Sequence, residues 1–190
     1  MRAVKSTFVK GLAIFNAPVL ARILGINEFL PHLPNINKYL AATCMVIPSV
    51  CEWVVELLGD AEADSFHSER FDVFMANYPC GASSKSFEHL AQMVRTGRFM
   101  YFDYGEKRNL ELYGQLETPS INLQKISKVP IGLIVGRNDL LSTVEDANWL
   151  RNTLQPEVLQ MFRETNNGHA GFLMSKDTGF LEDVISFVRR

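Results

Sequence analysis

The last third of the chain alternates short apolar runs with helical patterns, and this alternation limits the possible folds more than any other feature. Residues 129–136 (Val-Pro-Ile-Gly-Leu-Ile-Val-Gly) are continuously apolar, which is typical of a parallel strand buried on both faces. A helix is predicted from a Ser142 cap to about Leu154, then a second short strand over 158–162 and an amphipathic helix over 177–190. Strand, helix, strand and helix in this order predict the α/β class with a parallel sheet. The last helix is expected to turn its apolar side chains inward, namely Phe180, Leu181, Val184, Ile185 and Val188.

The first half of the chain has a different pattern. Residues 9–18 form a short apolar run that stops at an asparagine and a proline, and we interpret this run as a strand. Residues 20–90 show helical spacing punctuated by prolines. The chain has three cysteines, an odd number, so at least one is unpaired. Cys44 and Cys51 could bridge in an oxidising compartment or pack as small buried apolar side chains, and both interpretations stay open.

Charge and composition exclude several classes of protein. Lys and Arg number 19 against 21 Asp and Glu, giving a net charge of −2 with the basic residues scattered, so nucleic-acid binding is not expected. The apolar stretch 8–30 is interrupted by polar residues, and we identify neither a membrane-spanning segment nor a signal peptide in it. Asn-x-Ser/Thr glycosylation sequons are absent from the sequence.

One carboxylate and one imidazole are placed where an α/β sheet gathers its functional groups. Asp139 lies just past the first predicted strand, and His169 lies in the loop beyond the second. Since neighbouring parallel strands end at the same edge of a sheet, the two side chains would fall on adjacent loops. A carboxylate in that position can accept the imidazole Nδ1–H and stabilise the imidazolium formed during acyl transfer. Each residue also has a structural interpretation, a helix-entry aspartate and a packed histidine.

Several short motifs follow one another along residues 68–190. They are Ser68-Glu69-Arg70-Phe71-Asp72, Asn77-Tyr78-Pro79-Cys80-Gly81, Gly97-Arg98-Phe99, Phe102-Asp103-Tyr104-Gly105, Tyr113-Gly114-Gln115, Gly136-Arg137-Asn138-Asp139-Leu140-Leu141 and Gly168-His169-Ala170-Gly171-Phe172. In this order they resemble the acid lipase family of lysosomal and gastric lipases. The resemblance implies a partial α/β-hydrolase fold, the last parallel strands and helices of the sheet plus a helical cap. It divides the chain into a core strand (1–19), a cap (20–95) and the carboxyl-terminal part of the core (96–190).

By this resemblance Asp139 is the triad acid and His169 the triad base of a lipase-like ester hydrolase. The implied substrates are triacylglycerols or steryl esters, and no cofactor or metal is expected. Ala170 and Gly171 replace the Leu-Asp pair that the family typically carries after the histidine. Cys80 stands where the family usually has a small apolar residue, which fits a free packed thiol.

The largest departure from the family is the missing nucleophile. α/β-Hydrolases carry the serine on a G-x-S-x-G elbow that precedes the acid and the histidine, and this motif is absent from the 190 residues. Residues 81–84 (Gly-Ala-Ser-Ser) imitate it without the closing glycine and are interpreted as a helix cap. We therefore expect the elbow and the oxyanion-hole donors upstream of Met1, in a segment that would complete the fold.

Three functional hypotheses remain open. The first is an acid-lipase-type esterase whose active form includes an upstream segment. The second is a non-catalytic module that keeps the cap for lipid binding or interaction, with peripheral contact to a lipid surface. Phe29, Trp53 and Phe74 could face an acyl chain in this module, although core packing is the more common role for any one of them. The third is another α/β-hydrolase chemistry, such as an Asp-nucleophile dehalogenase or epoxide hydrolase.

Overall fold

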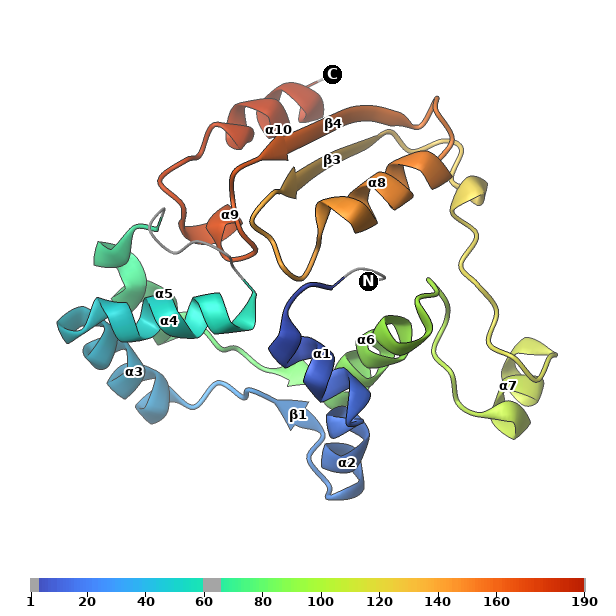
Figure 1. Cartoon of the computed structure of the whole chain (residues 1–190), viewed down its shortest axis with the longest axis horizontal. Coiled ribbons are helices and arrows are strands. Elements are labelled where there is room, and N and C mark those ends of the chain that lie inside the picture. The colour runs from blue at the N-terminus through green and yellow to red at the C-terminus, as the bar shows by residue number, and fades with distance from the viewer. Residues whose placement is uncertain (1–3, 60–65, 190) are drawn as a thin grey trace.

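A computed structural model describes residues 4–59 and 66–189 and contains a small parallel sheet beside a larger group of helices (Figure 1). The helices are α1 (Thr7–Ile14), α2 (Ala17–Ile23), α3 (Pro34–Val46), α4 (Pro48–Leu58), α5 (Phe71–Asn77), α6 (Ser84–Thr96), α7 (Glu106–Tyr113), α8 (Val144–Thr153), α9 (Gly171–Met174) and α10 (Phe180–Val188). The strands are β1 (Glu28–Phe29), β2 (Ala82–Ser83), β3 (Ile131–Gly136) and β4 (Leu159–Thr165), and 3-10 turns occupy Ser68–Arg70 and Leu123–Lys125. The chain is thus a mixed α and β structure, compatible with a partial α/β fold.

The parallel sheet is the pair β3 and β4, joined through α8 as the sequence predicts. The pairing runs from Ile131 opposite Leu159 to Gly136 opposite Thr165, so both strands end at the same edge. The helix cap differs from the prediction by one residue: Thr143, not Ser142, is the N-cap, and its hydroxyl accepts from the Asp146 N–H at 3.3 Å. Ser142 instead donates its backbone N–H to Asp139, which leaves it in the loop before the helix.

The strand predicted over residues 9–18 is wrong, because α1 and α2 cover this run. The Ser6 hydroxyl caps α1 by accepting from the Val9 N–H, and Asn16 separates the two helices in a left-handed conformation (φ 53°). Pro18 lies in the first turn of α2, where no backbone N–H is needed. A short apolar run does not distinguish a strand from a helix, and here both helices pack against α6. The core strand expected within residues 1–19 is therefore corrected to helices.

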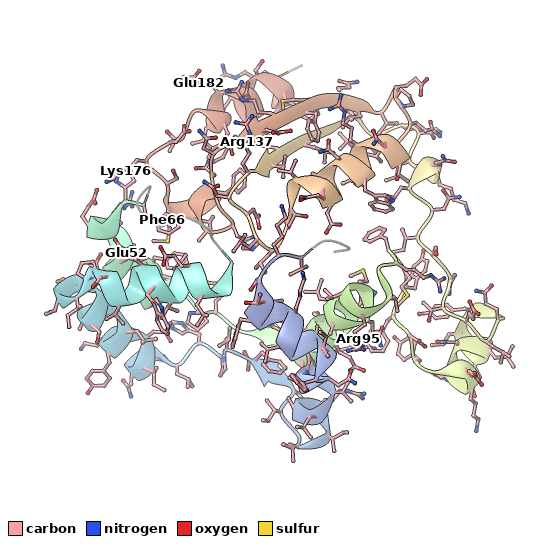
Figure 2. The ribbon with its side chains drawn as sticks, in the orientation of Figure 1. Glu52, Phe66, Arg95, Arg137, Lys176 and Glu182 are labelled. Carbon is pink, nitrogen blue, oxygen red and sulfur yellow. A yellow bond between two sulfur atoms is a disulfide. The ribbon has the colours of Figure 1, made fainter. Side chains whose placement is uncertain are left out.

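The main hydrophobic core lies in the helical region and reaches α9. Cys44 and Cys51 form a disulfide between the end of α3 and the start of α4, with Cα atoms 5.7 Å apart, and both are buried. Phe66, Phe71 and Met174 join the same cluster, and Phe66 lies between the helical region and α9 (Figure 2). The cluster therefore ties the helices to the segment just after His169. Cys80 is free, as expected, but it is exposed rather than packed.

The prediction that α10 buries its apolar side chains is wrong. Val188 is 75% exposed, and Leu181 and Ile185 are about half exposed. The helix contacts β3 and is held to β4 by the Arg163–Asp183 ion pair at 3.1 Å. A sheet of two strands is too narrow to cover the whole apolar face of the helix, so much of that face lies at the surface.

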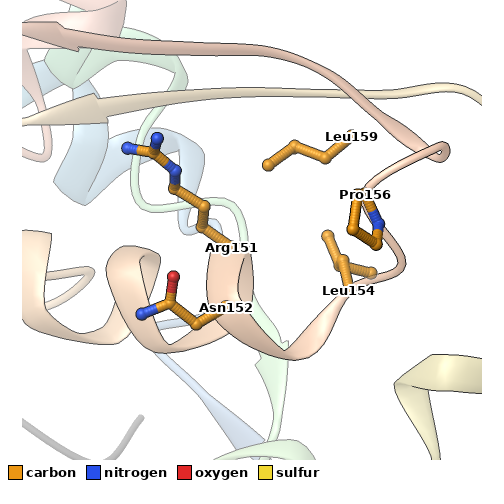
Figure 3. A pocket seen from close by; sticks show the side chains of 5 residues that line it. All are labelled: Arg151, Asn152, Leu154, Pro156 and Leu159. Carbon is orange, nitrogen blue, oxygen red and sulfur yellow. The ribbon is translucent and has the colours of Figure 1, made fainter.

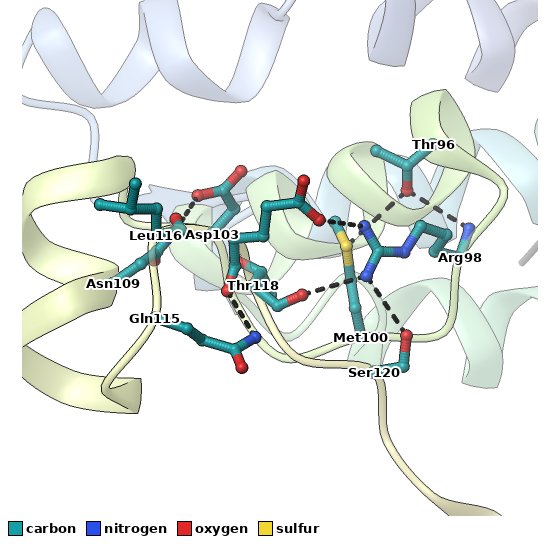
Figure 4. Close-up of polar contacts among 10 residues, drawn as sticks. Thr96, Arg98, Met100, Asp103, Asn109, Gln115, Leu116, Thr118 and Ser120 are labelled. Atoms are coloured by element: carbon teal, nitrogen blue, oxygen red, sulfur yellow. Dashed lines mark hydrogen bonds and ion pairs between the residues drawn. The ribbon is translucent and has the colours of Figure 1, made fainter.

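The connection between the helices and β3 is held by polar contacts around Asp103 and Arg98 (Figure 4). Asp103 accepts from the Gly105 N–H at 2.9 Å and from Asn109 Nδ2 at 2.8 Å. Arg98 donates to the carbonyl oxygen of Thr118 at 3.1 Å. These bonds fix the long irregular segment on either side of α7.

Within the described residues, no single helix is long and apolar enough to cross a membrane. The pair Pro34–Val46 and Pro48–Leu57 reaches that length and composition only together, across a bend of 113°.

Candidate active site

Asp139 occupies the turn after β3, and its carboxylate is almost fully enclosed. Oxygen Oδ1 accepts from the backbone N–H groups of Leu141 (2.8 Å) and Ser142 (2.7 Å). Oxygen Oδ2 lies 3.0 Å from Nδ1 of His169. The side chain is only 3% exposed, so each oxygen has protein partners in place of water.

His169 lies in the loop after β4, with its side chain about half exposed. An ionised carboxylate can only accept, so beside an ionised Asp139 the proton of this hydrogen bond is on Nδ1. In the neutral ring, Nε2 is then the proton-accepting atom. The adjacent loops bring the two residues together as the sequence predicts.

Segments distant in sequence hold the acid loop in place. The Leu140 N–H donates to the carbonyl oxygen of Gly59 at 2.9 Å. The Leu140 carbonyl oxygen accepts from the backbone N–H groups of Lys5 (2.7 Å) and Ser6 (3.1 Å). Lys5 also pairs with Glu145 at 2.7 Å, and this hydrogen bond is the main reason that the pKa of Glu145 is lowered. No spacing rule in the sequence connects these residues to Asp139, so sequence reasoning missed them.

The serines of the imitation motif serve structural roles. Ser83 is the N-cap of α6, and its hydroxyl accepts from the Lys85 N–H at 3.2 Å. The Ser84 hydroxyl donates to the carbonyl oxygen of Asn27 at 3.1 Å. Interpreting residues 81–84 as a helix cap is confirmed.

The three aromatic residues that could either face an acyl chain or pack in the core have different surroundings. Phe29 packs edge-on against Phe87, with ring centroids 5.2 Å apart. Phe74 stacks on Tyr78 at 5.1 Å. Trp53, in contrast, is 60% exposed on α4. Packing therefore accounts for two of the three, and only Trp53 is presented to solvent.

A pocket lies between the end of α8 and the start of β4, lined by Arg151, Asn152, Leu154, Pro156 and Leu159 (Figure 3). Leu159 is the first residue of β4, whereas His169 follows the last one. The pocket is thus at the opposite end of the strand from the Asp139–His169 pair and has no part in this site. Among the described residues, no group of three or more His, Cys, Asp or Glu side chains could hold a metal ion.

Comparison with curated proteins returns lipases from animals and plants. The chain is 29% identical over 88% of its length to lipase lipl-1 of Caenorhabditis elegans, spanning 43% of that protein. It is 28% identical over 88% of its length to triacylglycerol lipase 2 of Arabidopsis thaliana, spanning 42% of it. It is 28% identical over 91% of its length to the gastric triacylglycerol lipase of Bos taurus, spanning 44% of it.

The chain thus spans less than half the length of these curated relatives. No protein-family model matches it. The relatives are nevertheless all named as lipases, the bovine protein as a gastric lipase, and they match most of the chain. On this similarity, together with its motifs, the chain is similar to the acid lipase family.

Proposed function

We propose that this chain is part of a carboxylic ester hydrolase acting on lipid esters, triacylglycerols or steryl esters, with Asp139 as the acid and His169 as the base of a Ser-His-Asp triad. The observation that carries the proposal is the 3.0 Å contact between Asp139 Oδ2 and His169 Nδ1. The carboxylate holds the ring in the tautomer whose Nε2 can take a serine proton and pass it to the leaving alcohol.

The nucleophile in this proposal comes from outside the 190 residues. The sequence contains no G-x-S-x-G motif, and Ser83 and Ser84 have structural roles. The relatives are more than twice as long as the matched part. We infer that an upstream segment supplies the serine and the oxyanion-hole donors and completes an α/β-hydrolase sheet beside β3 and β4.

In this arrangement residues 96–190 belong to the hydrolase core and residues 20–95 to its helical cap. The helices α1 and α2 pack on α6, so we assign them to the cap as well.

We also propose that the corner between α3 and α4 contacts a lipid surface. Residues 39–51 contain no charged side chain. Met45 and Val46 are 67% and 78% exposed at the corner, and Trp53 is 60% exposed on the following helix. Apolar side chains held at the surface beside a tryptophan are suited to entering the headgroup region of a membrane or lipid droplet.

Catalysis is tested by joining the 190 residues to the part of bovine gastric triacylglycerol lipase that precedes the matched segment. The 190-residue chain alone is expected to show no measurable p-nitrophenyl ester hydrolysis, since a base and an acid without a nucleophile forfeit most of the rate enhancement. The joined protein is expected to hydrolyse the ester, and His169→Ala is expected to abolish this activity. Hydrolysis by the chain alone that His169→Ala abolishes would reveal a nucleophile within the 190 residues.

Lipid contact is tested by flotation of the 190-residue chain with neutral phosphatidylcholine vesicles. Val46→Asp is expected to abolish flotation, because it places a charge at the apolar corner. Val188→Asp is the matched control, since Val188 on α10 is nearly as exposed (75%) but lies outside the corner. Equal flotation of the two variants would contradict a role for the corner. A joined protein that binds vesicles without hydrolysing esters would favour the non-catalytic module.

A further inference from the structure

The loop that carries His169 is fastened to the end of β3 by a row of hydrogen bonds. The Arg137 N–H donates to the carbonyl oxygen of Thr165 at 2.9 Å, and Arg137 lies at this end of the sheet (Figure 2). Asn138 then makes two bonds of its own. Its backbone N–H donates to the Asn167 carbonyl oxygen at 3.3 Å, and its side-chain Nδ2 donates to the Asn166 carbonyl oxygen at 2.9 Å. The residue directly before the acid therefore holds two carbonyl groups that shortly precede the base.

Gly136 lets the two segments approach this closely. A Cβ atom at this position would collide with the carbonyl oxygen of Asn167 and lie 2.9 Å from its carbonyl carbon. Asn167 has little room to move away. Its side chain is buried and donates to the carbonyl oxygen of Asp177 at 3.4 Å, and its N–H donates to the Thr165 hydroxyl at 3.3 Å. Any side chain on Gly136 would therefore push on the backbone two residues before His169.

The distance between acid and base is sensitive to such a push. The contact from Asp139 Oδ2 to His169 Nδ1 is 3.0 Å, and hydrogen bonds of this kind are confined to about 2.7–3.2 Å. Asp139 is fixed separately by the N–H groups of Leu141 and Ser142. If the loop that carries His169 shifts, the Asp139 carboxylate therefore does not move with it, and the distance between Oδ2 and Nδ1 changes.

We propose that Gly136 and Asn138 are positioning residues that set His169 against Asp139. They act through the backbone of residues 166 and 167 and need not touch the substrate. The inference rests on the proposed function for its catalytic meaning, but the geometry that it describes can be measured without activity.

The primary experiment records the imidazole ¹⁵N shifts of His169 in the 190-residue chain, at a pH where the ring is neutral. The His169→Gln spectrum identifies its signals among the four histidines. In the wild-type chain, Nδ1–H is expected to be the major tautomer. Gly136→Ala and Asn138→Ala are each expected to make Nε2–H the major tautomer, because the bond to Asp139 is lengthened.

Two matched controls separate positioning from general damage. Gly132→Ala makes the same change on the same strand, but its Cβ would meet the flexible end of Met161 at 2.8 Å rather than backbone. Asn166→Ala removes the side chain that accepts from Arg137 and leaves in place the carbonyl that Asn138 holds. Both controls are expected to keep the wild-type tautomer. If Gly136→Ala does not fold, Asn138→Ala still decides the question.

The inference would be overturned if Asn138→Ala and folded Gly136→Ala both kept Nδ1–H as the major tautomer of His169. It would also be overturned if Nδ1–H were not the major tautomer in the wild-type chain. In the joined, ester-hydrolysing protein, Gly136→Ala is expected to lower kcat about 10²-fold with KM unchanged. Lack of hydrolysis in the joined wild-type protein would count against the proposed function and leave the tautomer result intact, so the two failures are distinguishable.

Discussion

At the scale of single residues, Asp139 illustrates how the site divides its contacts. One carboxylate oxygen is used by two backbone N–H groups, which fix the turn, and the other faces the imidazole. Because the group is buried and fully partnered, an amide in its place would both disturb the turn and present the wrong hydrogen-bonding partner to the ring.

In the joined protein, Asp139→Asn and His169→Ala are each expected to lower kcat by about 10³–10⁴ or more, because the imidazole loses its orienting acceptor or is removed. The measurement is kcat beside the thermal midpoint of each variant. Asp146→Asn, on α8, is the control and is expected to change kcat little. If Asp146→Asn lowered kcat as much as Asp139→Asn at an unchanged thermal midpoint, the acid would be misassigned. If neither Asp139→Asn nor His169→Ala lowered kcat, the triad interpretation would be wrong.

At the scale of elements, the turn at Asp103 shows how a segment without a sheet partner keeps its shape. Its hydrogen bond with Asn109, followed by that with the Gly105 N–H, lowers the pKa of the Asp103 carboxyl below its ordinary value of 3.8. A carboxyl whose pKa is lower in the folded chain stabilises the fold above its unfolded pKa and loses that contribution as the pH falls through the folded value.

Asp103→Asn is therefore expected to lower the free energy of unfolding at pH 7, and the difference from wild type is expected to shrink as the pH falls below about 3.8. Urea unfolding at several pH values measures this. Glu157→Gln, at an exposed position before β4, is the control and should change the free energy of unfolding little. A difference that stays constant down to pH 2 would assign the loss to packing rather than to the carboxylate.

At the scale of the whole molecule, large apolar side chains are buried together in the cluster that joins the helices to α9. Phe71 is fully buried and packs edge-on against Phe66, whereas the apolar residues of α10 are largely exposed. The chain therefore combines one well-packed core with apolar surface that a two-stranded sheet leaves uncovered.

Phe71→Ala is expected to destabilise the chain by about 3–5 kcal/mol, because it opens a cavity in this core. Val188→Ala on α10 is expected to change stability by less than about 0.5 kcal/mol, since that side chain is already in water. Denaturant unfolding followed by circular dichroism compares the two. A larger loss of unfolding free energy in Val188→Ala than in Phe71→Ala would mean that the stabilising core lies around β3, β4 and α10 instead.

The sequence by itself determined the parallel strand pair, the helix between them and the loops that carry Asp139 and His169, because a continuous apolar run followed by a capped helix has few alternatives. It also determined the cap at Ser83, which is a local hydrogen bond. Tertiary structure decided what depends on neighbours. Residues 9–18 are helical because α6 offers a face to pack on, and α10 stays exposed because the sheet beside it is narrow. The close approach of Gly136 to the Asn167 backbone likewise brings together two segments that are separated by a whole helix. The local sequence around a glycine does not indicate which distant backbone segment packs against it.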